Sequence, residues 1–196
     1  MLFHNYLEKL LGSKTKIKTL RAAFRFPGKS FTTRELSKLI GVSHTGVLKA
    51  LGDLEEMNIL HIETHGRANV VRLNKESFLA QHLQHIFKLE RETVSHLVED
   101  IRKSFNGFEA ASIAIFGSLV KGDEEPRSDV DLLIITKDKN GAEERTGELQ
   151  EKLAGKFGNS VSPHILSPGE FKKERAFREE VLSHHVMVSG KRLEDI

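Results

Sequence analysis

Two aspartates, Asp129 and Asp131, stand two residues apart at the start of the apolar segment LLIIT. On a strand, residues two apart share a face, so these carboxylates are expected side by side. Neighbouring carboxylates repel each other unless a cation lies between them. Mg²⁺ suits this role because it takes carboxylates together with phosphate oxygens. Metals so held can activate a hydroxyl and stabilise a leaving pyrophosphate, so the pair predicts a magnesium site for phosphate chemistry.

A glycine and a serine, Gly117 and Ser118, precede this pair and are separated from Asp129 by the ten residues LVKGDEEPRS. They follow the apolar segment AASIAIF, which reads as a strand. Glycine lets the backbone turn sharply and approach a phosphate closely. A helix that begins after Ser118 would direct its N–H groups and the positive end of its dipole at the same phosphate. This arrangement predicts a nucleotide-binding turn beside the two carboxylates.

The stretch FGSLVKGDEEPRSDVDLLI resembles the nucleotidyltransferase signature of the polymerase-β superfamily, and it looks most like the minimal nucleotidyltransferases of prokaryotes. The resemblance implies that Gly117 and Ser118 hold a nucleoside triphosphate and that Lys121 neutralises a phosphate. It also implies that Asp129 and Asp131 bind Mg²⁺. Minimal nucleotidyltransferases of this kind often act as antitoxins, so the resemblance also implies a partner toxin protein.

The sequence departs from this family where a third carboxylate is expected. Active members carry it on the next core strand, which we predict at residues 161–166. The matching positions are Ser162 and His164, and neither is acidic. Three interpretations stay open: His164 acts as the base, Asp123 or Glu125 moves in, or catalysis is lost and the domain only senses nucleotide. The next acid, Glu170, follows the strand in a helix predicted from residue 167 or 168 to 185, where it favours the helix dipole.

The first part of the chain predicts two short helices joined by a glycine turn. A helix over residues 14–26 precedes them. Thr32 and Glu35 have capping-box spacing, Gly41 permits a turn, and Ser43 can cap the second helix, which continues to Leu54. A strand over residues 59–64, a turn over 65–69 and a strand over 70–73 follow. This order resembles the winged helix-turn-helix domains of small transcriptional regulators.

In such domains the second helix enters the major groove and the wing contacts the DNA backbone or minor groove. Residues that would contact DNA directly are Ser43, His44, Thr45, Lys49 and, in the wing, Arg67. Arg34 and Lys38 would contact the backbone. The alternative interpretation of the fold is a protein–protein module.

The charge is divided unevenly along the chain. Residues 1–75 carry 13 Lys and Arg against 6 Asp and Glu, a net charge of +7, and residues 76–196 carry 17 against 22, a net charge of −5. A basic first part favours an anionic partner, for which nucleic acid is the usual candidate. Between the two parts, residues 76–106 predict one long amphipathic helix or two in tandem. Its apolar stripe packs either against a second copy, as a homodimer, or against the chain's own domains.

We therefore predict an α+β protein with three parts: a winged helix-turn-helix DNA-binding domain at 1–75, a linking helix at 76–106, and a nucleotidyltransferase-like domain at 107–196 with a small mixed sheet flanked by helices. The sequence has no cysteine, no bilayer-length apolar run and no signal-peptide pattern, which favours a cytoplasmic protein without a membrane partner. The predicted function is DNA binding combined with nucleotidyl transfer from NTP and Mg²⁺. The alternatives are a non-catalytic regulator that senses nucleotide and an inert interaction module.

Overall fold

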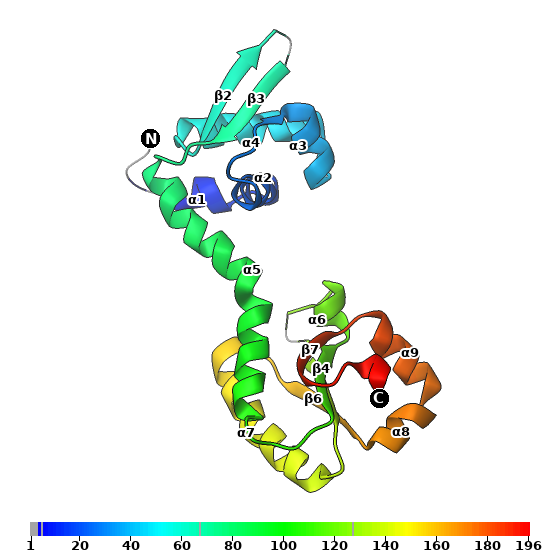
Figure 1. The fold of residues 1–196 in the computed structure, drawn as a ribbon. Helices are drawn as coiled ribbons and strands as arrows, with labels where there is room; N and C mark the ends of the chain where they lie inside the picture. Colours follow the sequence, from blue (N-terminus) through cyan, green and yellow to red (C-terminus); the bar gives the residue numbers. More distant parts are fainter. Residues whose placement is uncertain (1–3, 5, 67, 127) are drawn as a thin grey trace. The chain divides into compact units, whose positions relative to one another are not determined.

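The structure is a computed structural model that describes residues 4, 6–66, 68–126 and 128–196 (Figure 1). It contains two compact units, Met1–Glu92 and Thr93–Ile196, and each is described by itself. The boundary lies inside α5 (Phe78–Ser104), which is one continuous helix of 27 residues rather than two in tandem. Leu79 and Leu83 of α5 belong to the first core, and Leu97 and Ile101 belong to the second.

The first unit packs four helices against a three-stranded antiparallel sheet. The helices that precede α5 are α1 (Tyr6–Leu11), α2 (Lys14–Arg25), α3 (Thr33–Ile40) and α4 (His44–Glu56). The strands are β1 (Phe31–Thr32), β2 (Leu60–His65) and β3 (Ala68–Leu73), in the order β1-β3-β2. The β2–β3 hairpin is longer than the sequence predicted, because both strands extend into the segment expected as a turn.

Local side-chain chemistry accounts for the ends of α3 and α4. The Thr32 hydroxyl accepts the Glu35 amide at 3.2 Å, and the Glu35 carboxylate accepts the Thr32 amide at 2.7 Å, which completes the predicted capping box. Gly41 ends α3 at φ 63°, a backbone conformation that glycine adopts easily. Ser43 Oγ accepts the Gly46 amide at 3.2 Å and so caps α4. The two helices are therefore joined by a tight turn, as the sequence predicts.

The second unit is built on a four-stranded mixed sheet with the order β6-β5-β4-β7. Its strands are β4 (Ser112–Phe116), β5 (Val130–Ile135), β6 (Val161–Leu166) and β7 (Val186–Gly190). Strand β4 is antiparallel to β5 and β7, and β5 is parallel to β6. The helices after α5 are α6 (Ser118–Lys121), α7 (Lys139–Phe157), α8 (Pro168–Lys173) and α9 (Arg175–Ser183), with a 3₁₀ turn at Leu193–Asp195.

One sequence prediction about this unit was wrong. A single helix was expected from residue 167 or 168 to 185, but the chain breaks at Glu174 into α8 and α9 and then forms β7. Glu174 has φ −81° and ψ 68°, which is not helical. The two helices have separate roles in packing: Phe171 of α8 and Val181 of α9 are both fully buried in the same core cluster. Packing on the sheet therefore outweighs the continuity of helix-forming residues.

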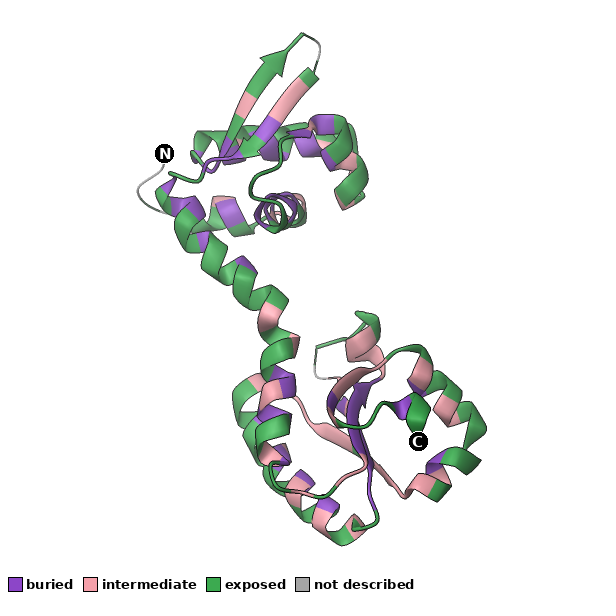
Figure 2. Ribbon diagram, viewed as in Figure 1, coloured by how far each residue is buried: buried purple, intermediate pink, exposed green. Residues whose placement is uncertain are grey.

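The two faces of this sheet bury different clusters. Ile113, Ile115 and Leu132 pack on one face with α5 and α7. Ala114, Phe116 and Leu133 pack on the other with α8, α9 and the C-terminal residues. Figure 2 shows the central strands as the most continuously buried part of the unit. Alternate residues of a strand face opposite sides of the sheet. The two clusters therefore also fix the face on which each polar residue at a strand end lies.

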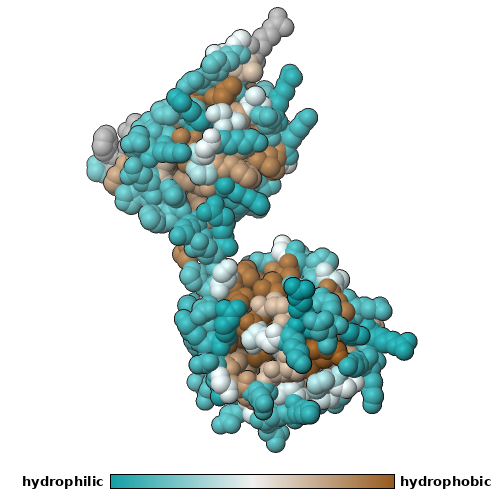
Figure 3. Space-filling view, viewed as in Figure 1, coloured by the Kyte–Doolittle hydropathy of each residue, from teal (hydrophilic) through white to brown (hydrophobic). Residues whose placement is uncertain are grey.

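Surface hydrophobicity is concentrated rather than evenly spread. In the space-filling view, hydrophobic side chains reach the surface of both units and are surrounded by hydrophilic ones (Figure 3). Leu39, Phe78, Ile86 and Leu89 are among the large apolar residues exposed by more than half. Within the described part of the chain, no helix combines the length and apolar character needed to span a membrane.

Candidate functional site

Gly117 and Asp131 meet at one end of the second sheet. Phe116, the last residue of β4, pairs with Asp131 of β5, so Gly117 leaves the sheet directly beside the aspartate. Gly117 has φ 79° and ψ −153°, a combination that only glycine adopts readily. A Cβ added there would lie 2.9 Å from Cγ of Asp131, so the carboxylate would have to move to make room for it. Two physical reasons therefore favour glycine at this position: its backbone conformation and the adjacent carboxylate.

Asp131 is half-buried and carries an unfavourable charge. Burial raises the pKa of its carboxyl above the ordinary value of 3.8, and nearby Asp129 and Glu180 raise it further. His164 and Lys121 act in the opposite direction, and the raised pKa is the net result. A carboxylate whose charge is not fully compensated by the protein is an expected feature of a cation or ligand site.

Asp129 has a different environment from Asp131. It is exposed, it precedes β5, and its Oδ1 accepts a hydrogen bond from Ser160 Oγ. Asp129 acts electrostatically on Asp131 and raises the pKa of its carboxyl. One carboxylate is thus solvated while the other is partly removed from water.

Short helix α6 and helix α9 contribute the charged residues around the aspartates. Ser118 is the first residue of α6, which Gly117 precedes, and Lys121 is its last. Lys121 Nζ lies 3.4 Å from Oε1 of Glu180 on α9. Glu180 is therefore a carboxylate near the pair that sequence reasoning missed. It lies one turn beyond Phe177, which packs toward the sheet, but its approach to Asp131 depends on how α9 docks.

His164 is held among aromatic rings on the same face of the sheet as Asp131. Its ring centroid is 5.1 Å from that of Phe116, edge to face, and 5.4 Å from that of Phe177, stacked. His164 acts electrostatically to lower the pKa of Asp131, against the larger effect of burial, so it lies near the pair. Asp123 and Glu125 are exposed in the loop between α6 and β5, and their carboxylates have no described interaction with the pair.

Asp129 and Asp131 are suitable for Mg²⁺ that arrives with a nucleotide. The described residues include no group of three or more His, Cys, Asp or Glu side chains arranged to hold a metal ion. Mg²⁺ is commonly bound by one or two carboxylates plus substrate phosphates, so an incomplete protein ligand set is compatible with this ion. The raised pKa of Asp131 also indicates a carboxylate whose ionisation a bound cation would favour.

The N-terminal unit has a groove at the predicted DNA face. The groove has a volume of about 600 Å³ and lies between the start of α3, the start of α4 and the β2–β3 hairpin. Arg34, His44 and His65 contribute its basic or ionisable side chains, and Leu48 contributes an apolar one that is 38% exposed. Sequence reasoning missed Leu48, since a leucine in a helix is normally assigned to the core.

The other predicted DNA contacts are distributed around this groove. Ser43 uses its hydroxyl to cap α4, and Thr45 is exposed near the start of the same helix. Lys49 is exposed but lies close enough to Asp53 to lower the pKa of that carboxyl, together with the stronger effects of Lys16 and Lys9. Lys49 is not among the residues that line the groove, whereas His44 is. Arg67 lies outside the described residues.

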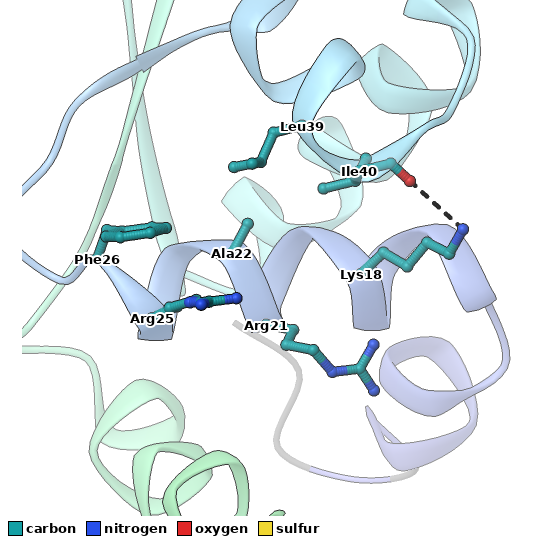
Figure 4. Close-up of a pocket in the computed structure, with 7 residues that line it drawn as sticks. All are labelled: Lys18, Arg21, Ala22, Arg25, Phe26, Leu39 and Ile40. Atoms are coloured by element: carbon teal, nitrogen blue, oxygen red, sulfur yellow. Dashed lines mark hydrogen bonds between the residues drawn. The ribbon is translucent and has the colours of Figure 1, made fainter. Parts of the chain in front are cut away.

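A second hollow in this unit lies between α2 and the end of α3 (Figure 4). Lys18 donates to the Ile40 carbonyl at 3.4 Å, and Arg21 is bound to both carboxylate oxygens of Glu90 at 2.6 and 2.8 Å. Phe26 and Leu39 form exposed apolar parts of its wall. Among the described residues predicted to contact DNA, none lines this hollow, so it is separate from the candidate DNA groove.

Several solved structures resemble parts of the chain weakly. AF1382 from Archaeoglobus fulgidus is 20% identical over 42% of this chain and 94% of its own, with a TM-score of 0.35. The antimony-specific transcriptional repressor AntR is 19% identical over 46% and 78%, with a TM-score of 0.39. A toxin–antitoxin structure with AMP-PNP is 19% identical over 50% and 77%, with a TM-score of 0.36. At these TM-scores the likenesses establish neither fold nor function. No curated protein matches the sequence.

A family match covers the region that contains the aspartates. It begins inside α5 and continues through β7, and it includes Gly117, Ser118, Lys121, His164 and both members of the Asp129–Asp131 pair. Residues 94–188 match the family model of the nucleotidyltransferase domain, so the C-terminal unit of this chain carries a nucleotidyltransferase domain.

Proposed function

We propose that the C-terminal unit binds an NTP with Mg²⁺ and transfers its nucleotidyl group to a hydroxyl acceptor, and that the N-terminal unit is a winged helix-turn-helix that binds DNA. The observation that carries the first part is the junction of Gly117 with Asp131. A backbone conformation restricted to glycine and a carboxylate with a raised pKa occur at the same end of the sheet. A backbone conformation that requires glycine, next to a carboxylate of perturbed pKa, is typical of ligand sites.

Each residue of the site has a proposed role. Gly117 and Ser118 present the backbone to the triphosphate, and Lys121 exchanges its carboxylate partner Glu180 for a phosphate oxygen. Asp129 and Asp131 hold Mg²⁺, which supplies positive charge that stabilises the phosphates and the leaving group when bound. The remaining interactions of the site are made by the chain's own side chains.

The transfer step needs a group that accepts one proton. The hydroxyl oxygen of the acceptor attacks the α-phosphorus, and the new O–P bond forms as the bond from that phosphorus to the bridging oxygen breaks. Pyrophosphate leaves with the electron pair, and the hydroxyl proton passes to a base. Glu180 and His164 are the candidates, because both act electrostatically on Asp131. Glu180 supplies a carboxylate from α9 that β6 lacks, and the aromatic contacts of His164 favour a positioning role.

The decisive experiment is transfer from α-labelled NTPs. Full-length protein is incubated with Mg²⁺, each NTP in turn and candidate acceptors, in parallel with equilibrium NTP binding. We expect label transfer that Asp131→Ala abolishes, that Glu180→Gln reduces strongly, and that the matched variant Glu179→Gln leaves unchanged, since Glu179 is an exposed neighbour on α9. Transfer that survives in Asp131→Ala would exclude the proposed site.

A second candidate function is a non-catalytic regulator that senses nucleotide. It is favoured by one observation: β6 has Ser162 and His164 where the family resemblance leads to a carboxylate, and His164 packs against Phe116 and Phe177. Such a regulator requires that nucleotide change the affinity of the N-terminal unit for DNA. NTP binding without transfer, combined with a shift in DNA affinity on adding NTP, would establish this function in place of the enzyme.

The DNA-binding part rests on the groove beside α4 and on its charge. Arg34 and His44 line the groove together, and the turn before α4 positions its first residues outward, as a major-groove helix requires. Duplex DNA binding measured across a range of salt concentrations tests it, because phosphate contacts make affinity fall with salt. A protein–protein module of the same fold would show no such dependence.

A further inference from the structure

The hollow between α2 and the end of α3 has no part in either proposed activity, and its walls combine positive charge with apolar surface (Figure 4). Its volume is about 430 Å³, which lies within the range of small-molecule sites. Seven residues line it, of which three are cations of α2 and four are apolar. The hollow therefore has both of the features from which the chemistry of a ligand can be inferred.

The cations of the hollow lie along one face of α2. Lys18, Arg21 and Arg25 are separated by three and four residues, the spacings that place helical side chains on the same face. Glu90 compensates Arg21 through the two hydrogen bonds already described. Within the described part of the chain, no carboxylate lines the hollow or forms an ion pair with Lys18 or Arg25. The hollow thus carries positive charge without an anionic partner.

Arg25 is better suited than Lys18 to bind an anion. The ammonium of Lys18 donates to the Ile40 carbonyl at 3.4 Å, so one of its donors is in use. The guanidinium carbon of Arg25 lies 5.7 Å from the centroid of the Phe26 ring, and no hydrogen-bond acceptor for this side chain is found among the described residues. A guanidinium presents paired donors that match a carboxylate. Arg25 therefore offers an anion-binding group beside an aromatic surface.

The apolar wall of the hollow is left open to water. Phe26 is 42% exposed and Leu39 is 53% exposed, and Figure 4 shows both beside Ala22 of α2. A ligand that covers these side chains gains free energy by removing apolar surface from water. A stable protein interface takes about 20–30 residues from each partner. Because only seven residues line the hollow, its extent favours a small molecule over a protein.

We propose that this hollow binds a small amphipathic anion, a molecule with one anionic head and an apolar body about 10 Å long. Lys18 and Arg25 are seven residues apart on α2, which corresponds to about 10 Å along a helix axis. The head is bound by Arg25, and the body covers Ala22, Phe26 and Leu39. This site is additional to the nucleotide site and the DNA groove, and it does not depend on either.

Two compounds with the same apolar chain and opposite charge test the site. Octanoate and octylammonium are each titrated into full-length protein with methyl-labelled alanine, isoleucine and leucine, and NMR shifts are followed. We expect octanoate to shift the methyls of Ala22, Leu39 and Ile40 with a Kd of about 1 mM, the affinity of a good fragment. Octylammonium should bind at the same methyls at least about fivefold more weakly, because the hollow carries positive charge.

Two pairs of variants separate the contributions of charge and apolar surface. Arg25→Gln should weaken octanoate binding about fivefold, whereas Lys14→Gln, which removes an exposed cation of α2 outside the hollow, should change it less than about twofold. Leu39→Gln should weaken the binding of both compounds about fivefold. Leu11→Gln changes a leucine of similar exposure, 56%, that does not line the hollow, and it should have little effect. All four side chains are exposed, so these variants are expected to fold.

Three results would overturn the proposal. The first is the absence of shifts at Ala22, Leu39 and Ile40 at octanoate concentrations up to about 10 mM, a range in which weak fragments bind. The second is equal binding of octanoate and octylammonium, which would show that the cations do not select an anion. The third is an equal effect of Arg25→Gln and Lys14→Gln, which would reduce the attraction to the overall charge of α2. None of these measurements uses NTP or DNA, so failure of this site is distinguishable from failure of the proposed functions.

Discussion

The two candidate sites differ in how far they depart from ordinary protein structure. At the sheet end of the C-terminal unit, Gly117 adopts a conformation restricted to glycine and Asp131 carries a raised pKa. At the groove of the N-terminal unit, Arg34, His44 and Leu48 are exposed side chains on regularly capped helices. A position restricted to glycine and a carboxylate of raised pKa are expected where a ligand must complete the site. A surface that meets the phosphate backbone of DNA needs only charge and shape.

The largest effect on NTP affinity should come from a substitution that fills the space beside Asp131. Gly117→Ala introduces a Cβ that collides with the Asp131 carboxylate and places alanine at φ 79°. We expect NTP affinity to fall about 100-fold, which corresponds to a few kcal/mol of strain. Equilibrium binding of NTP with Mg²⁺ measures it.

Gly122→Ala is the control for this substitution. Gly122 has φ 77°, but an added Cβ there meets nothing within 4 Å. It should lower thermal stability slightly and change NTP affinity less than about tenfold. Equal losses in the two variants would mean that backbone strain alone, and not the approach to Asp131, makes Gly117 necessary.

A substitution in the DNA groove should have a smaller effect, which changes both DNA affinity and its dependence on salt. Arg34→Ala should weaken duplex DNA binding about fivefold and reduce the slope of log affinity against log salt by about 0.9. Fluorescence anisotropy over a range of salt concentrations measures both quantities. Lys18→Ala removes a cation from the separate hollow on α2 and should leave both unchanged. If Lys18→Ala has the same effect as Arg34→Ala, DNA binding depends on overall charge rather than on the groove.

Substitution of Asp131 should affect thermal stability and ligand binding in opposite directions. Asn keeps the shape of the side chain but removes a half-buried charge whose pKa is raised by burial. For such a group, ionisation destabilises the folded state above its ordinary pKa of 3.8, so Asp131→Asn should raise the Tm of the ligand-free protein at neutral pH by about 1–3 °C. NTP with Mg²⁺ should no longer raise it. A lower ligand-free Tm would show that the protein compensates the charge fully.

The smallest effect is expected at Glu170, whose carboxyl pKa is lowered, whereas that of Asp131 is raised. Hydrogen bonds from Lys139 and from Ser167 lower the pKa of its carboxyl from 4.5 to about 2. Its contribution to stability is therefore present above pH 4.5 and is lost as the pH falls from 4.5 to about 2. Glu170→Gln should flatten this part of the Tm–pH curve, and Glu179→Gln should not. An unchanged curve for Glu170→Gln would contradict the assignment.

The sequence predicted features that depend on residues close together in the chain better than features that depend on distant residues. The capping box of Thr32 and Glu35 and the glycine turn at Gly41 were predicted, because each involves residues a few positions apart. Strand β6 was also predicted with its observed bounds. The break at Glu174 and strand β7 were not, since both depend on packing against residues distant in the chain.

The sequence by itself determined the carboxylate pair, the glycine turn before it, and the absence of an acid at Ser162 and His164, because these depend on residue type and spacing. Tertiary structure decided which groups surround Asp131. The docking of α9 brings Glu180 to Lys121, and the sheet register places Phe116 beside the aspartate. Side chains from distant segments share a surface only after the core clusters have packed, and no local pattern encodes that proximity.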